Sequence, residues 1–367
     1  MLGVRQDPTP DHRAASELYL TQPLLIGRAT LGGRWWGRIS LNAEGATLAD
    51  GELTPGAWGE GWYDRRHPHT VVHELMLGGS TGGRCGRARC EAAVFLGKGF
   101  VPFGSDDPMG RWLTAYPVNH HLAQILERAL GGVALRAGPL LAEAAVFNGD
   151  EPERPAQWPK LSRFADSWSA RLTATPLAGV ELAASYAEVA SPEARSGVGP
   201  DQRKWHAGLR VVRAAGATEL SGLAEWARTD EVGGFFRFES LLVEGSVATG
   251  RHRISVRAER TDRPEEERSE SFRALRPHLD NSLVGVTRWS LWTVQYRLAL
   301  PLGGVTVEPL AELTLGSARE TAGGLFSVEG AYGRTTVSRL AIGTRIAWRL
   351  RGDHRMGRYA GAPEHAH

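Results

Sequence analysis

Hydrophobic and polar residues alternate along much of the second half of the chain. Within 289–315, Trp292 and Val294 are apolar, whereas the neighbouring Thr293 and Gln295 are polar. A period of two places successive side chains on opposite faces of a β-strand, so this segment predicts a hairpin with one apolar face and one polar, charged face. The same pattern recurs in the segments 167–188, 204–228, 253–260 and 338–350.

The predicted strands are long, and the connections between them alternate in length. Many strands run to about ten residues or more, whereas strands of soluble proteins average about five or six. Short turns on one rim and long polar loops on the other are typical of an outer-membrane β-barrel, whose apolar face meets lipid and whose charged face lines a lumen. The short turns are predicted at 30–33, 138–139, 176–179, 214–217, 247–250 and 300–303, and the long loops at 46–68, 99–128, 149–165, 190–202, 263–283 and 317–335.

The pattern therefore predicts an all-β fold, an antiparallel transmembrane β-barrel of about 14–16 strands. We expect short periplasmic turns, long outer loops and an inward-folded loop at 99–128. We also expect an N-terminal segment at 1–16, a barrel at 17–350 and a flexible C-terminal tail at 351–367. About fifteen strands are recognisable, and bacterial barrels carry an even number. Either one strand is missing before a late start of the chain, or the count is wrong by one. The soluble alternative is a sandwich or solenoid with one wet face.

Composition narrows the choice of function. Formal net charge is only +2, so no global basic field points to nucleic acid as a partner. No run of about 18 apolar residues is present, which excludes a transmembrane helix. The chain also lacks a basic start followed by an apolar core, the pattern of a signal peptide. The two cysteines, Cys85 and Cys90, either form a small disulfide in an oxidising compartment or remain free thiols in a turn.

Two stretches concentrate histidine. In "DRRHPHTVVHEL", the residues His67, His69 and His73 share one parity and would lie on one face of a regular strand. In "PVNHHLAQILER", His120 and His121 lie in the long loop that we expect to fold into the lumen. Neutral imidazole suits Zn²⁺, Cu²⁺ or Ni²⁺, so one hypothesis is a metal site, with Cu or Zn as the possible cofactor.

Two alternatives to the metal site remain open. The charged residues around the histidines would satisfy one another in a paired constriction without metal, or they would form a solute-selective filter. Charges of both signs on the polar strand faces argue against strong anion selectivity. The residues expected to line the pore are Asp64, Arg65, Arg66, Glu74, Glu127, Arg128, Arg171, Arg297, Glu308 and Glu312, with Arg210, Arg257, Arg345, Glu181, Glu219 and Glu225 on the same strand faces.

Several motifs of residues 44–193 resemble, in order, those of an uncharacterised family of bacterial porin-like outer-membrane proteins, often met near metal-handling functions. "EGWYDRRHPHTVVHEL" is similar to its acidic–arginine–His-Pro-His segment, and "PVNHHLAQILERALGGVAL" to its paired-histidine loop. "AEAAVFNGDEPE", "DSWSARLTATP" and "ASPE" resemble three shorter signatures. The family's loop carries an Asp-Ser-Thr-His run where this chain has "LAQILER", which removes one possible ligand. The resemblance implies a barrel in the bacterial outer membrane.

The functional prediction is a porin-like channel for small solutes or ions, in contact with the lipid bilayer, with a histidine-rich lumenal cluster. A plugged metal-binding or structural barrel without transport is the alternative. No enzyme is expected, because no Ser–His spacing typical of a nucleophile and its base stands out. "HELM" also lacks the second histidine of the His-Glu-x-x-His motif and lies in a predicted strand.

Overall fold

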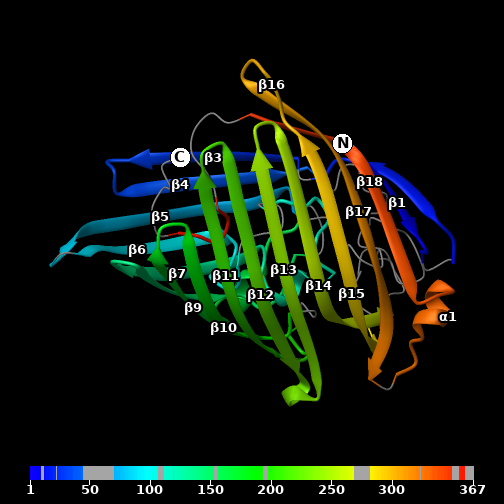
Figure 1. Ribbon diagram of the computed structural model, residues 1–367. Helices are drawn as coiled ribbons and strands as arrows, with labels where there is room; N and C mark the ends of the chain where they lie inside the picture. Colours follow the sequence, from blue (N-terminus) through cyan, green and yellow to red (C-terminus); the bar gives the residue numbers. More distant parts are fainter. Residues whose placement is uncertain are drawn as a thin grey trace.

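The computed structural model describes residues 1–9, 12–21, 23–43, 70–86, 88–105, 111–118, 120–152, 156–192, 197–267, 282–322, 324–348 and 355–359. Within these ranges the chain is almost entirely β-structure, and the strands curl around a common interior (Figure 1). None of the helices in the described ranges is long and apolar enough to cross a membrane.

Eighteen strands form one antiparallel sheet. They are β1 (Leu2–Asp7), β2 (Ala15–Tyr19), β3 (Leu24–Leu31), β4 (Trp35–Asn42), β5 (Val72–Cys85), β6 (Ala88–Gly99), β7 (Arg128–Ala137), β8 (Leu140–Phe147), β9 (Ser167–Leu177), β10 (Val180–Val189), β11 (Gln202–Ala215), β12 (Thr218–Glu231), β13 (Phe236–Thr249), β14 (His252–Glu267), β15 (Ser282–Leu298), β16 (Leu300–Leu302), β17 (Val305–Ala322) and β18 (Thr336–Ala347). The short helical elements are η4 (His120–Leu122), η5 (Leu161–Arg163), η6 (Val232–Gly234) and α1 (Val328–Tyr332).

Most strands pair with their neighbours in the chain, and β18 pairs with β1, which in turn pairs with β2. Both β15 and β16 pair with β17, so they form one long strand interrupted at Ala299. The order of pairing leaves β2 and β3 as the two ends of the sheet, and no ladder joins them among the described residues. They follow each other in the chain across residues 20–23. When β2 and β3 are counted as one strand, and β15 and β16 as another, the sheet has sixteen strands. This number is the upper end of the expected range.

The two faces of the sheet differ as the alternation predicts. On β15, Trp292 and Val294 are 71% and 45% exposed, whereas Gln295 is 1% exposed and points inward. On β9, Trp168 and Leu172 point outward and Arg171 inward. Apolar side chains thus cover the outside, and charged side chains are buried inside. This inverted distribution is that of a transmembrane barrel, and it confirms the predicted fold class.

The loop between β6 and β7 folds inward, as predicted. Its residues Phe100, Phe103 and Tyr116 are all buried. At Gly104, where φ is +70°, a Cβ atom would lie 1.6 Å from the carbonyl oxygen of Ala123. The loop doubles back on itself so closely there that only glycine fits.

Two expectations are corrected. The sheet does not begin at residue 17, because β1 pairs with β18 along its whole length. The predicted flexible tail is not flexible throughout, since residues 355–359 lie buried inside the barrel. Trp289 of β15 points inward and packs edge-on against Tyr332 of α1.

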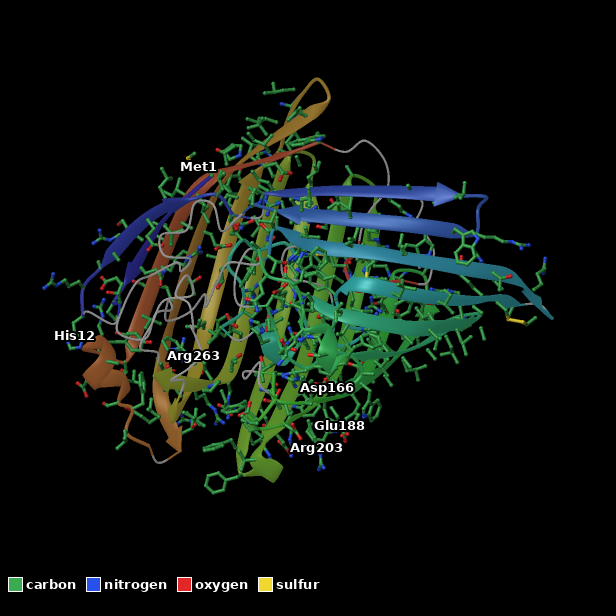
Figure 2. All side chains as sticks on the ribbon, turned by 180° about the vertical axis from the view of Figure 1, so that it is seen from behind. Met1, His12, Asp166, Glu188, Arg203 and Arg263 are labelled. Carbon is green, nitrogen blue, oxygen red and sulfur yellow. A yellow bond between two sulfur atoms is a disulfide. The ribbon has the colours of Figure 1, made fainter. Side chains whose placement is uncertain are left out.

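The two cysteines form a disulfide across the tight turn between β5 and β6. The Cα atoms of Cys85 and Cys90 are 5.7 Å apart. The bridge appears as the yellow bond at the tip of this hairpin in Figure 2. Of the two alternatives, the structure therefore shows the disulfide.

Candidate pore constriction

Loop 100–127 crosses the interior and is held on the far wall by Glu312 of β17. The carboxylate of Glu312 accepts hydrogen bonds from the backbone N–H groups of Thr114, at 2.8 Å, and Ala115, at 3.1 Å. It also accepts bonds from the amide of Gln295, at 2.8 Å, and from the guanidinium of Arg339, at 2.5 Å. Because all four partners converge on one fully buried carboxylate, Glu312 fixes the middle of the loop to the wall.

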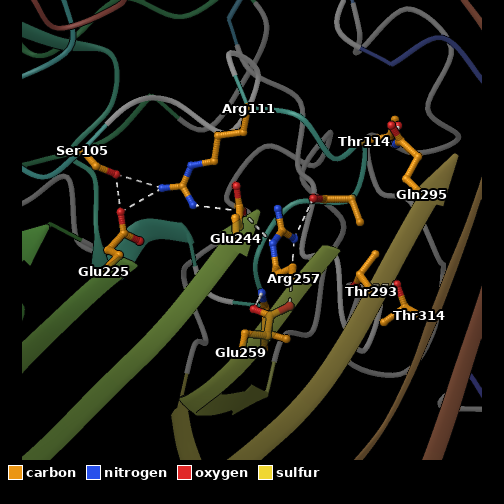
Figure 3. Close-up of polar contacts among 12 residues, drawn as sticks. Ser105, Arg111, Thr114, Glu225, Glu244, Arg257, Glu259, Thr293, Gln295 and Thr314 are labelled. Atoms are coloured by element: carbon orange, nitrogen blue, oxygen red, sulfur yellow. Dashed lines mark hydrogen bonds and ion pairs between the residues drawn. The ribbon is translucent and has the colours of Figure 1, made fainter. Parts of the chain in front are cut away.

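Arg111 places a cation of the loop between two wall carboxylates (Figure 3). Its guanidinium lies 2.9 Å from Glu225 of β12 and 3.4 Å from Glu244 of β13. The hydroxyl of Ser105, also in the loop, donates to Glu225 as well. The neighbouring His206 of β11 lies 3.4 Å from the same carboxylate. The buried positive charge of Arg111 is therefore compensated by two carboxylates inside the lumen.

Arg257 and Glu259 of β14 complete the contacts on this wall (Figure 3). Arg257 donates to Glu244 at 2.7 Å and to the carbonyl oxygen of Ala115 at 2.8 Å. Glu259 accepts a bond from the backbone N–H of Val118 at 3.0 Å. The wall thus supplies a donor for a loop carbonyl and acceptors for loop N–H groups, so the backbone polar groups of the loop stay paired away from water.

Two of the predicted pore-lining residues, Arg297 and Glu308, meet at the edge of this network. The guanidinium of Arg297 on β15 lies 3.2 Å from the carboxylate of Glu308 on β17. It also donates to the carbonyl oxygen of Trp112 in the loop, at 2.7 Å. The carboxylate of Glu308 lies 3.3 Å from the guanidinium of Arg345, which is half-exposed. This side of the lumen combines a buried ion pair with a group open to solvent.

A second internal segment, residues 355–359, lies against the opposite wall. Arg355 donates both terminal nitrogens to the carboxylate of Glu181 on β10, at 2.8 and 3.0 Å. Arg358 donates to the same carboxylate at 2.9 Å and to the hydroxyl of Thr173 on β9 at 3.0 Å. Burial in the barrel, followed by the neighbouring charge of Arg171, lowers the pKa of Arg358 to about 9. The carboxylate of Glu143 lies 4.0 Å from Arg358.

The backbone and the ring of this segment are also held. Arg171 donates to the carbonyl oxygen of Gly357 at 2.5 Å, and Arg38 donates to that of Arg358 at 3.3 Å. The ring of Tyr359 stacks on Phe95 with 4.3 Å between the centroids. Its hydroxyl donates to the carbonyl oxygen of Phe100 at 2.6 Å, so the segment touches the beginning of loop 100–127.

Of the predicted ligands, His73 is fully buried at the start of β5. Its Nδ1 contacts the carboxylate of Glu127, and its ring meets Phe100 edge-on at 4.8 Å between centroids. The register between β4 and β5 shifts at this point, which removes His73 from the regular alternation. The backbone N–H of Thr70 donates to Glu127 at 3.2 Å, and Lys98 contacts the Thr70 hydroxyl. A charge-paired cluster therefore surrounds this histidine.

The other predicted ligands are placed only in part. His120 begins η4, and His121 lies 3.5 Å from the carboxylate of Glu151, which also contacts Arg128. Among the residues that the structure describes, no group of three or more histidine, cysteine or carboxylate side chains could hold a metal ion. The predicted site residues Asp64, Arg65, Arg66, His67 and His69 lie outside the described residues.

Three more of the predicted lining residues, Glu74, Arg128 and Arg171, are buried and have polar partners. Glu74 of β5 lies 3.8 Å from Arg38 of β4. Arg171 lies 2.7 Å from Glu143 of β8, and Arg128 donates to the carbonyl oxygen of Leu126 at 2.7 Å. In the two ion pairs, Glu74 with Arg38 and Arg171 with Glu143, opposite charges on adjacent strands neutralise each other.

Several residues of the constriction are absent from the sequence-based set. Glu244 and Glu259 lie on strands and share the inward parity of their neighbours, so a stricter reading of the alternation would find them. Arg111, Arg355 and Arg358 lie in irregular segments, where no periodicity indicates which way a side chain points.

Comparisons with protein-family models and with curated proteins found no match. Comparison with solved structures found barrels of similar size. One is a loop-deletion mutant of OmpT, an outer membrane protein of Vibrio cholerae, with a TM-score of 0.50 and 9% identity over 94% of this chain and 95% of that chain. Another is the anion-selective porin from Comamonas acidovorans, with a TM-score of 0.50 and 11% identity over 94% and 98%.

The chain has the fold of an outer-membrane β-barrel. This confirms the coarser part of the sequence resemblance, a porin-like barrel. Membership of the motif family with its histidine segments stays a prediction, because no family model matches.

Proposed function

We propose that this chain is an outer-membrane channel that passes small solutes or ions through a constricted lumen. The observation that carries the proposal is the inverted barrel, apolar outside and charged inside, crossed by loop 100–127. The likeness to a protein described as an anion-selective porin supports transport rather than catalysis. Because the described lumenal charges are largely paired, we expect weak ion selectivity.

Planar bilayers test transport directly. Protein refolded in detergent should give current steps, and a salt gradient should give a reversal potential close to zero. Heat-modifiable migration on gels verifies the fold in the same sample. Folded protein that gives no current steps would favour the second candidate, a plugged barrel without transport. The observation that favours this second candidate is the buried position of residues 355–359 in the interior of the barrel.

The membrane assignment has its own test. Val294 lies on the outward face of β15, opposite Val256 of β14 and Leu313 of β17. Val294→Arg should block assembly in lipid vesicles, because a charge near the bilayer midplane of a barrel costs about 2–4 kcal/mol. Val294→Leu is the matched control and should assemble like the parent. Normal assembly of the arginine variant would contradict a lipid-facing surface.

A further inference from the structure

The wall beneath residues 355–359 is chemically suited to arginine. One carboxylate, that of Glu181, accepts three charge-assisted hydrogen bonds from two guanidinium groups. Thr173 accepts a fourth bond, and Glu143 adds a second negative charge 4.0 Å from Arg358. Paired, planar N–H donors are the feature that separates guanidinium from ammonium groups, so these contacts favour arginine over lysine.

The same wall also contacts the backbone carbonyl groups of the segment and the ring of Tyr359. Arg38 and Arg171 donate to two successive carbonyl oxygens of the segment, those of Arg358 and Gly357. Phe95 stacks on the ring of Tyr359. We call the six wall residues the arginine pocket; they are Arg38, Phe95, Glu143, Arg171, Thr173 and Glu181.

We propose that the arginine pocket is a binding site for short arginine-bearing peptides, and that residues 355–359 occupy it as an internal ligand. The pocket combines carboxylates for guanidinium groups, donors for peptide carbonyls and a ring surface for an aromatic side chain. Those are the contacts of peptide recognition rather than of strand packing, since the segment forms no ladder with the wall. This site goes beyond the proposed channel, because binding does not require conduction.

A free peptide can displace residues 355–359 from the arginine pocket because many of the contacts that hold the segment are made by its side chains. Each charge-assisted hydrogen bond is directional, and a free peptide of the same sequence offers the same donors to Glu181. Two residues of the wall also hold each other, since Glu143 and Arg171 pair at 2.7 Å. A preformed site loses little freedom when it binds.

The test uses the full chain with Arg355→Gln/Arg358→Gln, which weakens the internal ligand. A fluorescent peptide, Arg-Met-Gly-Arg-Tyr, copies residues 355–359 and is titrated in detergent by anisotropy. We expect it to bind the double variant at least about tenfold more tightly than it binds the parent, whose pocket is filled. The peptide Gln-Met-Gly-Gln-Tyr should bind the double variant at least about tenfold more weakly than the arginine peptide.

The control variant is Arg203→Gln/Arg237→Gln, which makes the same change of charge at exposed positions; Arg203 lies at the rim near Glu188 (Figure 2). It should bind the peptide no better than the parent. Adding Glu181→Gln to the double variant should remove the preference for the arginine peptide. Equal binding of the two peptides, or equal binding to parent and double variant, would overturn the proposal. If the double variant does not fold, Arg358→Gln alone gives the same comparison.

Conductance separates this proposal from the channel. In bilayers, the arginine peptide should reduce the current of the double variant, and the glutamine peptide should not. A barrel that binds the peptide but never conducts would refute the channel and leave the pocket standing. A conducting barrel that fails to bind the peptide would refute the pocket alone.

Discussion

Loop 100–127 and residues 355–359 both lie inside the barrel, but the wall holds them by different chemistry. Around the loop, Glu312 and Glu259 accept bonds from backbone N–H groups, and Arg257 donates to a backbone carbonyl. Around the segment, Glu181 accepts bonds from the side chains of Arg355 and Arg358. The wall contacts of the loop are therefore mostly independent of its side chains, whereas the contacts of the segment with Glu181 depend on its two arginine side chains.

The two kinds of contact differ in the free energy needed to detach each segment from the wall. A backbone N–H that loses its partner inside the barrel stays buried and unsatisfied, so the loop resists partial detachment. When the segment detaches, in contrast, water can hydrate the guanidinium groups of Arg355 and Arg358. We therefore expect the loop to behave as part of the wall and the segment as an occupant of it.

The largest expected effect is at Glu312. Glu312→Ala removes the acceptor for the backbone N–H groups of Thr114 and Ala115 and also the carboxylate that pairs with the buried Arg339. Loss of one partner of a buried ion pair costs about 3–5 kcal/mol, so urea unfolding in micelles should shift strongly. Glu188→Ala, at an exposed rim position, should cost less than about 1 kcal/mol. Similar shifts for both variants would show that Glu312 does not anchor the loop.

A smaller effect should follow at Arg111, where the loop does use a side chain. Arg111→Met removes a positive charge that lies between Glu225 and Glu244. The constriction then carries excess negative charge, so the reversal potential in a salt gradient should move toward cation selectivity. Arg203→Gln is the exposed control and should leave the potential unchanged. A shift toward anions would contradict the assigned position of Arg111 in the lumen.

A change at Glu181 should release the segment while the barrel stays folded. Glu181→Gln weakens charge-assisted bonds worth about 1.5–3 kcal/mol, so trypsin should cut after Arg355 and Arg358 about tenfold faster. Mass spectrometry identifies the two products. Unchanged cleavage beside the control Glu188→Gln would mean that Glu181 does not hold the segment.

The smallest and least constrained expectation concerns metal. Binding of Cu²⁺ or Zn²⁺ by His67, His69, His73, His120 and His121 remains a prediction, and His73 is already in contact with Glu127. Calorimetry on the parent and on His69→Ala/His73→Ala, with residues 360–367 deleted in both, should show weaker binding to the variant. Imidazole ligands must be deprotonated, so binding should also weaken below about pH 6.5. Equal heats would eliminate the site.

The sequence predicts the strands of the barrel wall much better than the two segments inside the barrel. Alternation places Arg171, Arg297 and Glu312 inside because a strand has a fixed period and a barrel has only two faces. It fails at β1, where the inward residues Leu2 and Val4 are apolar and pack against Leu310 and Ala341. A short strand with that inverted pattern does not stand out from an irregular terminus.

The interior segments escape prediction for a different reason. Arg111 and Arg358 lie where the backbone has no repeat, so their direction depends on contacts between residues far apart in the chain. The stretch "GDHRMGRYAG" is polar and rich in glycine, which is the composition of a flexible end. The burial of residues 355–359 depends on acidic partners on β8 and β10, Glu143 and Glu181, that composition does not reveal. The disruption at His73 likewise follows from a shift in register between β4 and β5.

The disulfide at the tip of the β5–β6 hairpin gives the molecule a marker of sidedness. Cys85 and Cys90 lie at the rim of short turns, which in outer-membrane barrels faces the periplasm. That compartment is kept oxidising, so the bond can form where the turn comes to rest. A thiol label too bulky to pass the lumen would reach these sulfurs, once reduced, from one side of the membrane only. The orientation of the whole barrel can therefore be determined from a pair of atoms that takes no part in the constriction.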